Sequence, residues 1–275
     1  MDCKYYSEQS FNDIFTKPSY ANHSAPFSIL HSNIRSFSAN GADMNNLLSL
    51  FTHRFSVVCL SETWLNSYNY SAAIIPNYSP VHLYRTDRTG GGVSIFVHNR
   101  FSYIERNDLS SMHSCCEAIF IEINKNSMNS ERNVLVGCIY RPPKSCIAEF
   151  NDRLKSILTS LTGEKKHIYL TGDFNINLLN ADSHILTSEF IELMFSTSLL
   201  PTINKPTRVG RSSATIIDNI FINNTHYNVI DAGILTSDIS DHFPVFCITP
   251  FNEHSSSRVN YVTKRKYNDL NKAKF

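Results

Sequence analysis

The apolar residues of this chain fall into short runs that recur between residues 27 and 248, with polar or Gly/Pro-containing segments between them. Runs of this length, bounded by turn residues, are typical of buried β-strands. The pattern predicts strands at 27–33, 57–60, 93–97, 118–123, 134–140, 167–170, 215–222 and 243–248.

Three other segments carry apolar residues at intervals of three and four, the spacing of one helix face. They predict helices at 43–53, from 147 to 161 and at 190–195. Some predicted strands are joined through these helices and others through hairpin-like turns. This mixture predicts an α/β fold in which two mixed β-sheets pack face to face with helices outside.

The two ends of the chain differ from this pattern. Residues 1–25 are polar, rich in Ser and Asn and without periodicity, so we expect a loose N-terminal arm before a domain at 26–250. Residues 251–275 are polar again and include Lys264-Arg265-Lys266. We expect a linker there that leads toward a further domain. A length of 275 residues is ordinary for one two-sheet α/β enzyme.

The composition of the chain limits the kinds of function that it can have. Hydrophobic residues make up 42% of the chain, which is enough for a large core, and the net charge is only +1. Any binding to nucleic acid must therefore rest on local basic clusters. The seven cysteines include no C-x-x-C pair, so the sequence predicts neither a disulfide framework nor a zinc site. No secretory signal and no membrane-spanning run is evident.

Polar side chains recur at the ends of the predicted strands. They are carboxylates and amides, at Asn33, Glu62, Asp173, Asn175 and Asp241. An oxygen-rich set of this kind suits Mg²⁺ or Mn²⁺. Each residue alone could simply cap a strand or a turn. The repeated placement at strand ends favours a metal site.

His242 and Asp218 form a candidate pair. A carboxylate inside the otherwise apolar run 215–222 is costly unless it has a partner. An imidazole would supply that partner, and the carboxylate would fix the tautomer of the ring and raise its basicity. Tyr140 ends another strand and could donate to a phosphate oxygen. Gly90-Gly91-Gly92 lacks the lysine of a P-loop and predicts a turn.

Six motifs occur in an order that resembles the endonuclease/exonuclease/phosphatase superfamily. They are His31-Ser32-Asn33-Ile34-Arg35-Ser36, Leu60-Ser61-Glu62-Thr63-Trp64-Leu65, Ile139-Tyr140-Arg141-Pro142-Pro143, Thr171-Gly172-Asp173-Phe174-Asn175-Ile176-Asn177, Ile217-Asp218-Asn219-Ile220-Phe221 and Ser240-Asp241-His242-Phe243-Pro244-Val245. Within the superfamily they are most similar to the endonuclease domain of jockey-like non-LTR retrotransposons. The resemblance covers residues 27–249 and implies a four-layer α/β sandwich.

The resemblance also implies roles at the reacting phosphate. Asp173 corresponds to the residue that orients or deprotonates the attacking water, with Asn175 beside it. His242 corresponds to the group that contacts the phosphate, oriented by Asp218. Tyr140 corresponds to the phenol that holds the scissile phosphate.

Metal and substrate contacts follow from the same resemblance. Glu62 corresponds to the principal ligand of Mg²⁺ or Mn²⁺, with Asn33 as a further metal-site residue and Asp241 as support. Thr215 matches a hydroxyl position that contacts phosphate.

The segment 205–213 contains three basic residues and lies between the third helix and the Asp218 strand. It predicts a hairpin, and a solvated hairpin is the usual fate of such a segment. The resemblance implies instead a hairpin that enters or straddles a DNA groove. Arg208 and Arg211 would then contact phosphate or a narrow minor groove.

Taken together, the sequence predicts a metal-dependent endonuclease that nicks DNA, of the non-LTR retrotransposon type. The nick would leave a 3′-hydroxyl that primes reverse transcription, by a reverse transcriptase fused downstream. Synthesis would be cytoplasmic and action nuclear. The alternatives are an abasic-site endonuclease or phosphatase of the same fold, and a catalytically inactive phosphoester-binding module.

Overall fold

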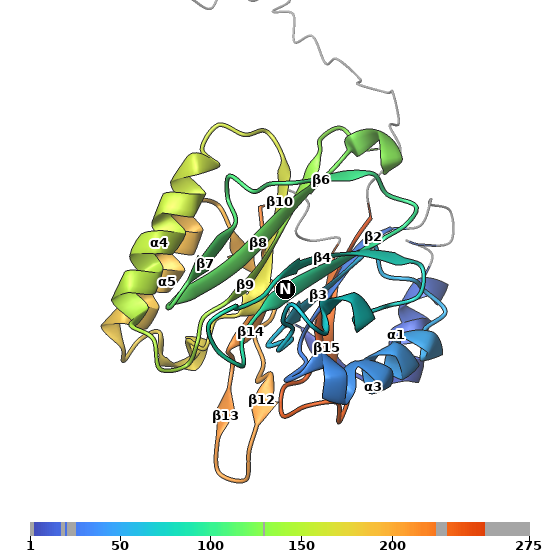
Figure 1. The fold of residues 1–275 in the computed structure, drawn as a ribbon, viewed down its shortest axis with the longest axis horizontal. Helices are drawn as coiled ribbons and strands as arrows, with labels where there is room; N and C mark the ends of the chain where they lie inside the picture. Colours follow the sequence, from blue (N-terminus) through green and yellow to red (C-terminus); the bar gives the residue numbers. More distant parts are fainter. Residues whose placement is uncertain (1–2, 18–19, 21–25, 129, 224–229, 251–275) are drawn as a thin grey trace, which may run out of the picture.

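Two seven-stranded β-sheets form the centre of the protein in a computed structural model that describes residues 3–17, 20, 26–128, 130–223 and 230–250 (Figure 1). The first sheet has the order β1-β15-β16-β2-β3-β5-β4. Its strands are β1 (Lys4–Tyr6), β15 (Asp231–Leu235), β16 (Val245–Thr249), β2 (Phe27–Asn33), β3 (Val57–Ser61), β5 (Val93–His98) and β4 (Tyr78–Leu83). The pairs β1/β15 and β2/β3 are parallel and the others antiparallel, so the sheet is mixed.

The second sheet has the order β11-β14-β10-β9-β8-β6, and β7 also pairs with β8. Its strands are β11 (Leu200–Pro201), β14 (Asp218–Ile222), β10 (His167–Asp173), β9 (Val134–Tyr140), β8 (Cys116–Ile123), β6 (Tyr103–Glu105) and β7 (Ser111–His113). Only β9 and β10 run parallel. A separate hairpin consists of β12 (Arg208–Val209) and β13 (Ala214–Thr215), and it projects from the body (Figure 1).

Helices cover the two outer faces of the sheets. Helices α1 (Glu8–Asn12) and α3 (Phe37–Leu50) lie on one side of the molecule, and α4 (Ile147–Ser160) and α5 (Ile185–Ser196) lie on the other (Figure 1). Four 3₁₀ turns complete the described elements, η1 (Asp13–Thr16), η2 (Tyr70–Ala72), η3 (Lys125–Ser127) and η4 (Leu178–Asn180).

Alternation along the strands builds the layers. In β3, Val57 and Cys59 face the second sheet in the central core, whereas Val58 and Leu60 pack with residues of α3. Strands β8 to β10 and β14 present their other faces to α4 and α5 in a third cluster. Successive strand residues point to opposite faces, so strands that are apolar on both faces can be buried on both. The predicted four-layer α/β sandwich with two mixed sheets is therefore confirmed.

The expected loose arm is wrong for the described part of residues 1–25. There β1 pairs with β15, and Phe11 and Ile14 are buried. Polar residues dominate this segment, but its few apolar side chains are enough to dock it. The expected linker at 251–275 lies outside the described residues.

Helix α3 begins earlier than predicted, because Ser36 caps it by accepting a hydrogen bond from the backbone of Ala39. The predicted strand 215–222 is divided between β13 and β14. No helix in the described part of the chain is long and apolar enough to cross a membrane.

Candidate functional site

The predicted site residues come together where strands of both sheets end. Asn33 ends β2, Tyr140 ends β9 and Asp173 ends β10, while Asp218 begins β14. Because β10 and β14 are antiparallel, Asp173 lies directly opposite Asp218, and Asp173 also pairs in register with Tyr140 on the parallel strand β9. Side chains that are far apart in the sequence thus share one edge.

Gly172 allows β10 to approach its neighbour closely. A Cβ atom at this position would lie 1.8 Å from the carbonyl oxygen of Ile139 on β9, so no other residue fits without moving the strand. The glycine of the Thr171-Gly172-Asp173 motif is therefore needed to set Asp173 at its place beside β9.

Asn33 links two carboxylates across the sheets. Its Nδ2 donates to Asp173 Oδ2 at 2.8 Å and to Glu62 Oε1 at 2.9 Å. Asn175 donates to the Asp173 carboxylate from its backbone N and from its Nδ2, each at 3.0 Å. Glu62 and Asn175 both adopt positive φ (51° and 47°), which is uncommon for residues with a side chain. Strained positions of this kind at a polar cluster support a functional role.

His242 and Asp218 pair as predicted. The Nδ1–H of His242 donates to Asp218 Oδ2 at 2.9 Å, and both side chains are buried. Burial by itself lowers the pKa of His242, but the charge and hydrogen bond of Asp218 outweigh it and raise the pKa to about 9. For Asp218, burial raises the pKa and the His242 charge outweighs it, so the pKa lies below its ordinary value. The pair is an imidazolium–carboxylate at neutral pH.

The pKa of Asp173 is shifted in the opposite direction to that of Asp218. Burial, and then the charge of Asp218, raise the pKa of Asp173 to about 7. A carboxylate that titrates near neutrality can accept a proton at physiological pH and release it again. Burial and the charge of Glu62 raise the pKa of Tyr140, so its phenol remains protonated and can donate a hydrogen bond.

Arg141 and Thr207 support the site and were not among the predicted residues. The buried guanidinium of Arg141 donates to the carbonyl oxygens of Phe174 (2.7 Å) and Asn175 (2.6 Å), which fixes the loop after Asp173. Thr207 donates from its Oγ1 to Asp218 Oδ2 at 2.7 Å. In the sequence, the position of Arg141 between Tyr140 and two prolines was a signal that could have identified it. Thr207 lies in a polar segment, and nothing in the sequence distinguished it.

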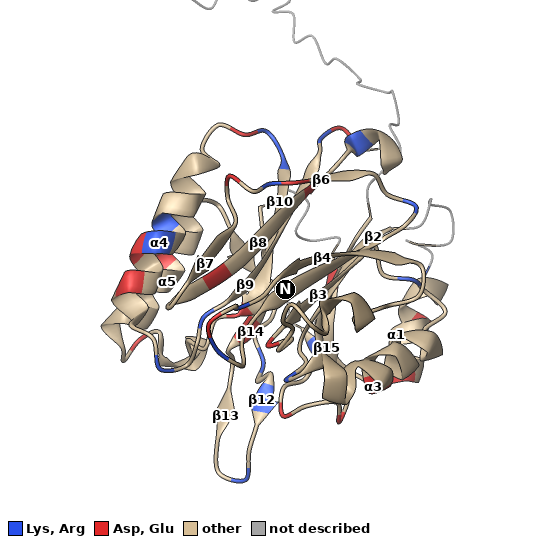
Figure 2. Cartoon of the chain, in the orientation of Figure 1, with Lys and Arg blue, Asp and Glu red and all other residues tan. Residues whose placement is uncertain are grey.

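The basic hairpin predicted at 205–213 is confirmed as β12 and β13, and basic residues lie on β12 and near its tip (Figure 2). Arg208 is not free, because its Nε donates to Asp241 Oδ2 at 2.8 Å. Arg35 donates to the other oxygen of Asp241 at 3.1 Å. The backbone carbonyl of Thr215 accepts from Thr207, and Arg211 is exposed near the turn.

Ligand atoms of Asp173, Asp218 and His242 lie within 4.8 Å of one another, but His242 is protonated and paired with Asp218, so these residues offer a metal ion their two carboxylates and not the imidazole. Glu62 joins them through Asn33, so the donors of the wider site are carboxylate and amide oxygens. Hard cations such as Mg²⁺ take oxygen ligands of this kind. The residues present therefore fit a divalent metal, with Asp241 outside the group and paired with arginines.

Comparison with known proteins agrees with this geometry. The model of the endonuclease/exonuclease/phosphatase family matches residues 30–242. No curated protein sequence is similar enough to count as a relative. Solved structures that share the fold include three nucleases. The endonuclease domain of TRAS1, a telomere-specific non-LTR retrotransposon, has TM-score 0.66 and 13% identity, with 83% of this chain and 100% of that chain covered.

The AP endonuclease LMAP from Leishmania major has TM-score 0.66 and 12% identity, with 87% of this chain and 91% of that chain covered. The 3′-5′ exonuclease NExo from Neisseria meningitidis has TM-score 0.61 and 15% identity, with 82% and 100% covered. At these identities the likeness establishes the fold alone.

Proposed function

The chain belongs to the endonuclease/exonuclease/phosphatase family, and from this premise we propose that it is a metal-dependent DNA endonuclease that nicks its target, of the non-LTR retrotransposon type. One observation carries the proposal. A carboxylate with its pKa near neutrality, Asp173, and a buried imidazolium–carboxylate pair, His242–Asp218, lie at one edge of the sheets. This set can deprotonate water and stabilise a phosphate in the same place.

The chain's own residues perform distinct tasks in hydrolysis. Asp173 accepts a proton from water, whose oxygen forms the new bond to phosphorus, and Asn175 holds the Asp173 carboxylate in place. The P–O3′ bond breaks, the 3′-oxygen takes a proton from solvent to become a hydroxyl, and Asp173 returns its proton to solvent, so the reaction consumes one water molecule. His242, protonated at neutral pH, and the phenol of Tyr140 donate hydrogen bonds to phosphate oxygens.

Glu62, with Asn33 beside it, would hold the Mg²⁺ or Mn²⁺ ion. When bound, the ion supplies charge neutralisation at the phosphate and the leaving oxygen. The carboxylate of Glu62 accepts hydrogen bonds from Asn33 and from Trp64 Nε1, the latter at 3.3 Å, so its orientation is set by neighbours on two sides.

The retrotransposon assignment rests on the six motifs and on the likeness to the TRAS1 domain. We further propose that the chain acts on nuclear DNA as the endonuclease part of a product that also contains a reverse transcriptase. The similarity to an AP endonuclease and to NExo favours, as a second candidate, a repair enzyme or phosphatase of the same fold. Intact Glu62, Asp173, Asp218 and His242 argue against an inactive module.

Plasmid relaxation tests the proposal. We expect the purified chain to convert supercoiled plasmid to the nicked form with Mg²⁺ and to stop when EDTA is added. Asp173→Ala and His242→Ala should each lower the rate by about 10²- to 10⁴-fold, as is usual for a lost acid or base. Asp152→Ala, which removes an exposed carboxylate on α4, is the matched control and should nick normally.

Two outcomes would contradict the proposal. Undiminished nicking in EDTA would show that the reaction does not require a metal. Normal rates in either alanine variant would show that the proposed site is not the active site. A parallel assay on abasic DNA and on phosphate monoesters distinguishes the second candidate, because a repair enzyme or phosphatase would prefer those substrates to plain plasmid.

A further inference from the structure

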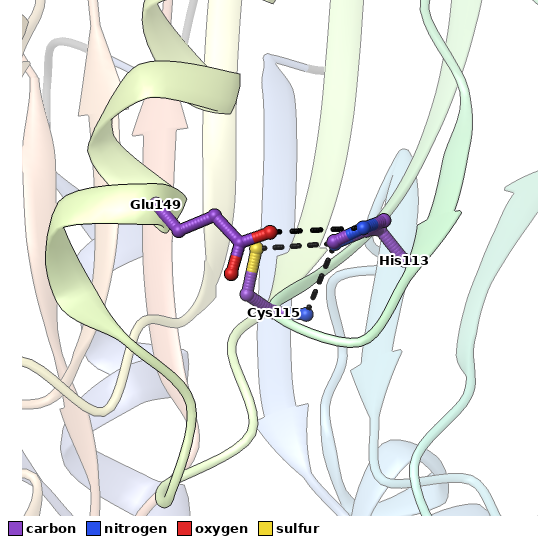
Figure 3. A group of neighbouring side chains, drawn as sticks. All are labelled: His113, Cys115 and Glu149. Carbon is purple, nitrogen blue, oxygen red and sulfur yellow. Dashed lines mark hydrogen bonds and ion pairs between the residues drawn. The ribbon is translucent and has the colours of Figure 1, made fainter.

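A second cluster of metal-binding side chains lies away from the nuclease site, between β7, β8 and α4 (Figure 3). His113 ends β7, Cys115 lies in the turn to β8, and Glu149 lies in the first turn of α4. In Figure 3 the three side chains point toward one another from the helix and from the turn. Two segments separated in sequence, the β7–β8 turn and the first turn of α4, thus direct an imidazole, a thiol and a carboxylate to one point.

The spacing of these side chains fits a small cation. His113 Nδ1 lies 3.3 Å from Cys115 Sγ, and His113 Nε2 lies 3.7 Å from Glu149 Oε1. Ligand atoms on a tetrahedral Zn²⁺ lie about 3.4–3.6 Å apart, given its usual bond lengths to S, N and O. These two distances involve different ring nitrogens, whereas one ion binds a single ring nitrogen together with the thiolate and the carboxylate. One ligand atom of each residue already lies within 4.8 Å of the others, so a rotation of the imidazole and of the Glu149 side chain completes the arrangement. Both side chains have room for it, with 30% and 49% exposure.

The donor set also selects the class of metal. Thiolate and imidazole are ligands of borderline and soft cations, whereas Mg²⁺ prefers oxygen alone. Cys115 is buried, at 1% exposure, while the other two ligands face solvent. An ion can therefore enter from solvent and keep a water molecule as its fourth ligand. Arg153 Nε, 3.9 Å from Glu149 Oε1, is the competing cation that the metal would displace.

We propose that His113, Cys115 and Glu149 form a binding site for a borderline transition metal, Zn²⁺ first, separate from the Mg²⁺ site of the nuclease centre. The bound ion would join the β7–β8 turn to the start of α4. That junction matters because Cys116 begins β8, and β8 pairs with β9, whose last residue is Tyr140. The site would therefore stabilise the outer layer next to the strands that hold the nuclease residues.

Cobalt titration tests the proposal on the full chain without a histidine tag and under reducing conditions without a thiol reductant. Co²⁺ replaces Zn²⁺ in such sites, and a thiolate ligand gives an intense charge-transfer band in the near ultraviolet. We expect this band to saturate at one ion per chain, to disappear on addition of Zn²⁺, and to persist in excess Mg²⁺. The nuclease residues Asp173, Asp218 and His242 contain no sulfur and cannot produce it.

Matched variants assign the band. Cys115→Ser should abolish it, whereas Cys146→Ser, which alters the exposed cysteine at the start of the same helix, should retain it. His113→Gln and Glu149→Gln keep the thiol and should each weaken Co²⁺ binding at least tenfold, since even outer-shell changes cost about 10–100-fold. These two variants also serve if Cys115→Ser fails to fold.

Thermal unfolding gives a second measurement. Zn²⁺ should raise the Tm of the wild type and of Cys146→Ser, and should not raise that of His113→Gln to the same extent, because only a ligand that binds the folded state stabilises it. The proposal is overturned if the wild type shows no thiolate band. It is also overturned if the band and the Zn²⁺-dependent Tm shift are unchanged in His113→Gln and Glu149→Gln.

Discussion

At the scale of single residues, the site depends on how buried charges are partnered. Asp173 and Asp218 lie opposite each other on adjacent strands, and two neighbouring carboxylates are costly to ionise together without water. His242 resolves the conflict for Asp218, because a cation in contact lowers its pKa. Among the described residues, the hydrogen-bond donors to Asp173 are amide and backbone N–H groups, and its pKa stays near 7. In the proposed mechanism, Asp218 orients the imidazolium and Asp173 exchanges protons with water.

Asp218→Asn tests this division of roles. An amide can still hydrogen-bond the ring but does not stabilise its charge, so the pKa of His242 should fall from about 9 to its ordinary value or below. Because His242 must be protonated to donate to phosphate, nicking by the wild type should fall as pH rises through about 9. In the variant this fall should begin at lower pH. Identical pH–rate profiles would mean that the pair has no role in the reaction.

The same variant has a stability signature. The folded pKa of His242 is raised above its unfolded value, so the pair stabilises the fold fully below pH ~6.5 and loses this contribution as pH rises through about 9. The shift corresponds to about 2–4 kcal/mol. Urea unfolding should therefore show the largest difference between wild type and Asp218→Asn at pH ~6 and a smaller one at pH ~10. A constant difference would contradict the linkage.

At the scale of elements, the loop at 90–92 positions Glu62. The backbone N of Gly92 donates to the buried carboxylate of Glu117 on β8, which also accepts from Arg85 Nε. The carbonyls of Gly91 and Gly92 accept from the backbone of Trp64 and Thr63. Gly92 has φ +83°, and a Cβ there would lie 2.8 Å from Thr63 Oγ1. The predicted turn at 90–92 thus holds the backbone of Thr63 and Trp64, directly after Glu62; we call this set of hydrogen bonds from Glu117 to Trp64 the brace.

Glu117→Gln tests this brace. Losing the charge leaves Arg85 in a largely buried position without its partner, which typically costs about 3–5 kcal/mol. Because the brace also sets Glu62, we expect the Mg²⁺ concentration for half-maximal nicking to rise, while the rate at saturating Mg²⁺ changes less. Glu105→Gln, on the exposed edge strand β6, is the control. An unchanged Mg²⁺ requirement in a destabilised Glu117→Gln protein would limit Glu117 to a structural role.

The hairpin β12–β13 connects the arginines that we expect to contact DNA with the His242–Asp218 pair. The backbone of Thr207 pairs with Thr215 and Phe243, while its hydroxyl contacts Asp218. Arg208 is engaged by Asp241, so DNA phosphate must compete for it, whereas Arg211 is exposed near the tip.

Replacing Arg208 and Arg211 by Ala should weaken DNA binding and flatten its dependence on salt. Each lost phosphate contact lowers the slope of log K against log salt by about 0.9. Binding measured by fluorescence anisotropy at several salt concentrations checks this. The single variant Arg211→Ala removes a DNA contact but leaves the Arg208–Asp241 ion pair intact. It therefore separates the loss of a DNA contact from the loss of this ion pair.

Exchange of the loop for that of a relative should change the nicking positions and keep the metal requirement. An unchanged cleavage pattern would contradict a role of the loop in site choice.

At the scale of the whole molecule, the N-terminal segment completes the first sheet and its outer layer. Phe11 on α1 is fully buried, with ring centroids 4.5 Å from Phe51 and 4.9 Å from Phe246. These partners come from the end of α3 and from β16, so the segment connects parts that are distant in the chain.

Phe11→Ala should lower the free energy of unfolding by about 3–5 kcal/mol, the usual cost of a large buried aromatic. Chemical denaturation monitored by circular dichroism measures it. Phe195→Ala, which alters a half-exposed phenylalanine on α5, should cost much less. Equal effects of the two changes would mean that the segment 3–17 is not part of the folded core.

Local patterns in the sequence determined the later two helices, the polar residues at strand ends and the strands β2, β3, β5, β8, β9, β10, β14 and β16, because periodicity and burial act between near neighbours. They did not indicate β1, β4, β6, β7, β11 and β15, most of which are short strands at or near the sheet edges. The motif order indicated the family, and the buried Asp218 in an apolar run indicated its partner His242. Both inferences depend on the identity of a few residues, which the sequence states directly.

Apart from the Asp218–His242 pair, only the tertiary structure decided which side chains meet. The sequence did not place Arg141 against the loop after Asp173. It also indicated no zinc site, because His113 and Cys115 meet Glu149 only when α4 packs on the second sheet. It also could not assign Arg208 to Asp241 or the N-terminal segment to the core. Contacts between distant segments depend on strand order and helix packing, and no local pattern encodes those.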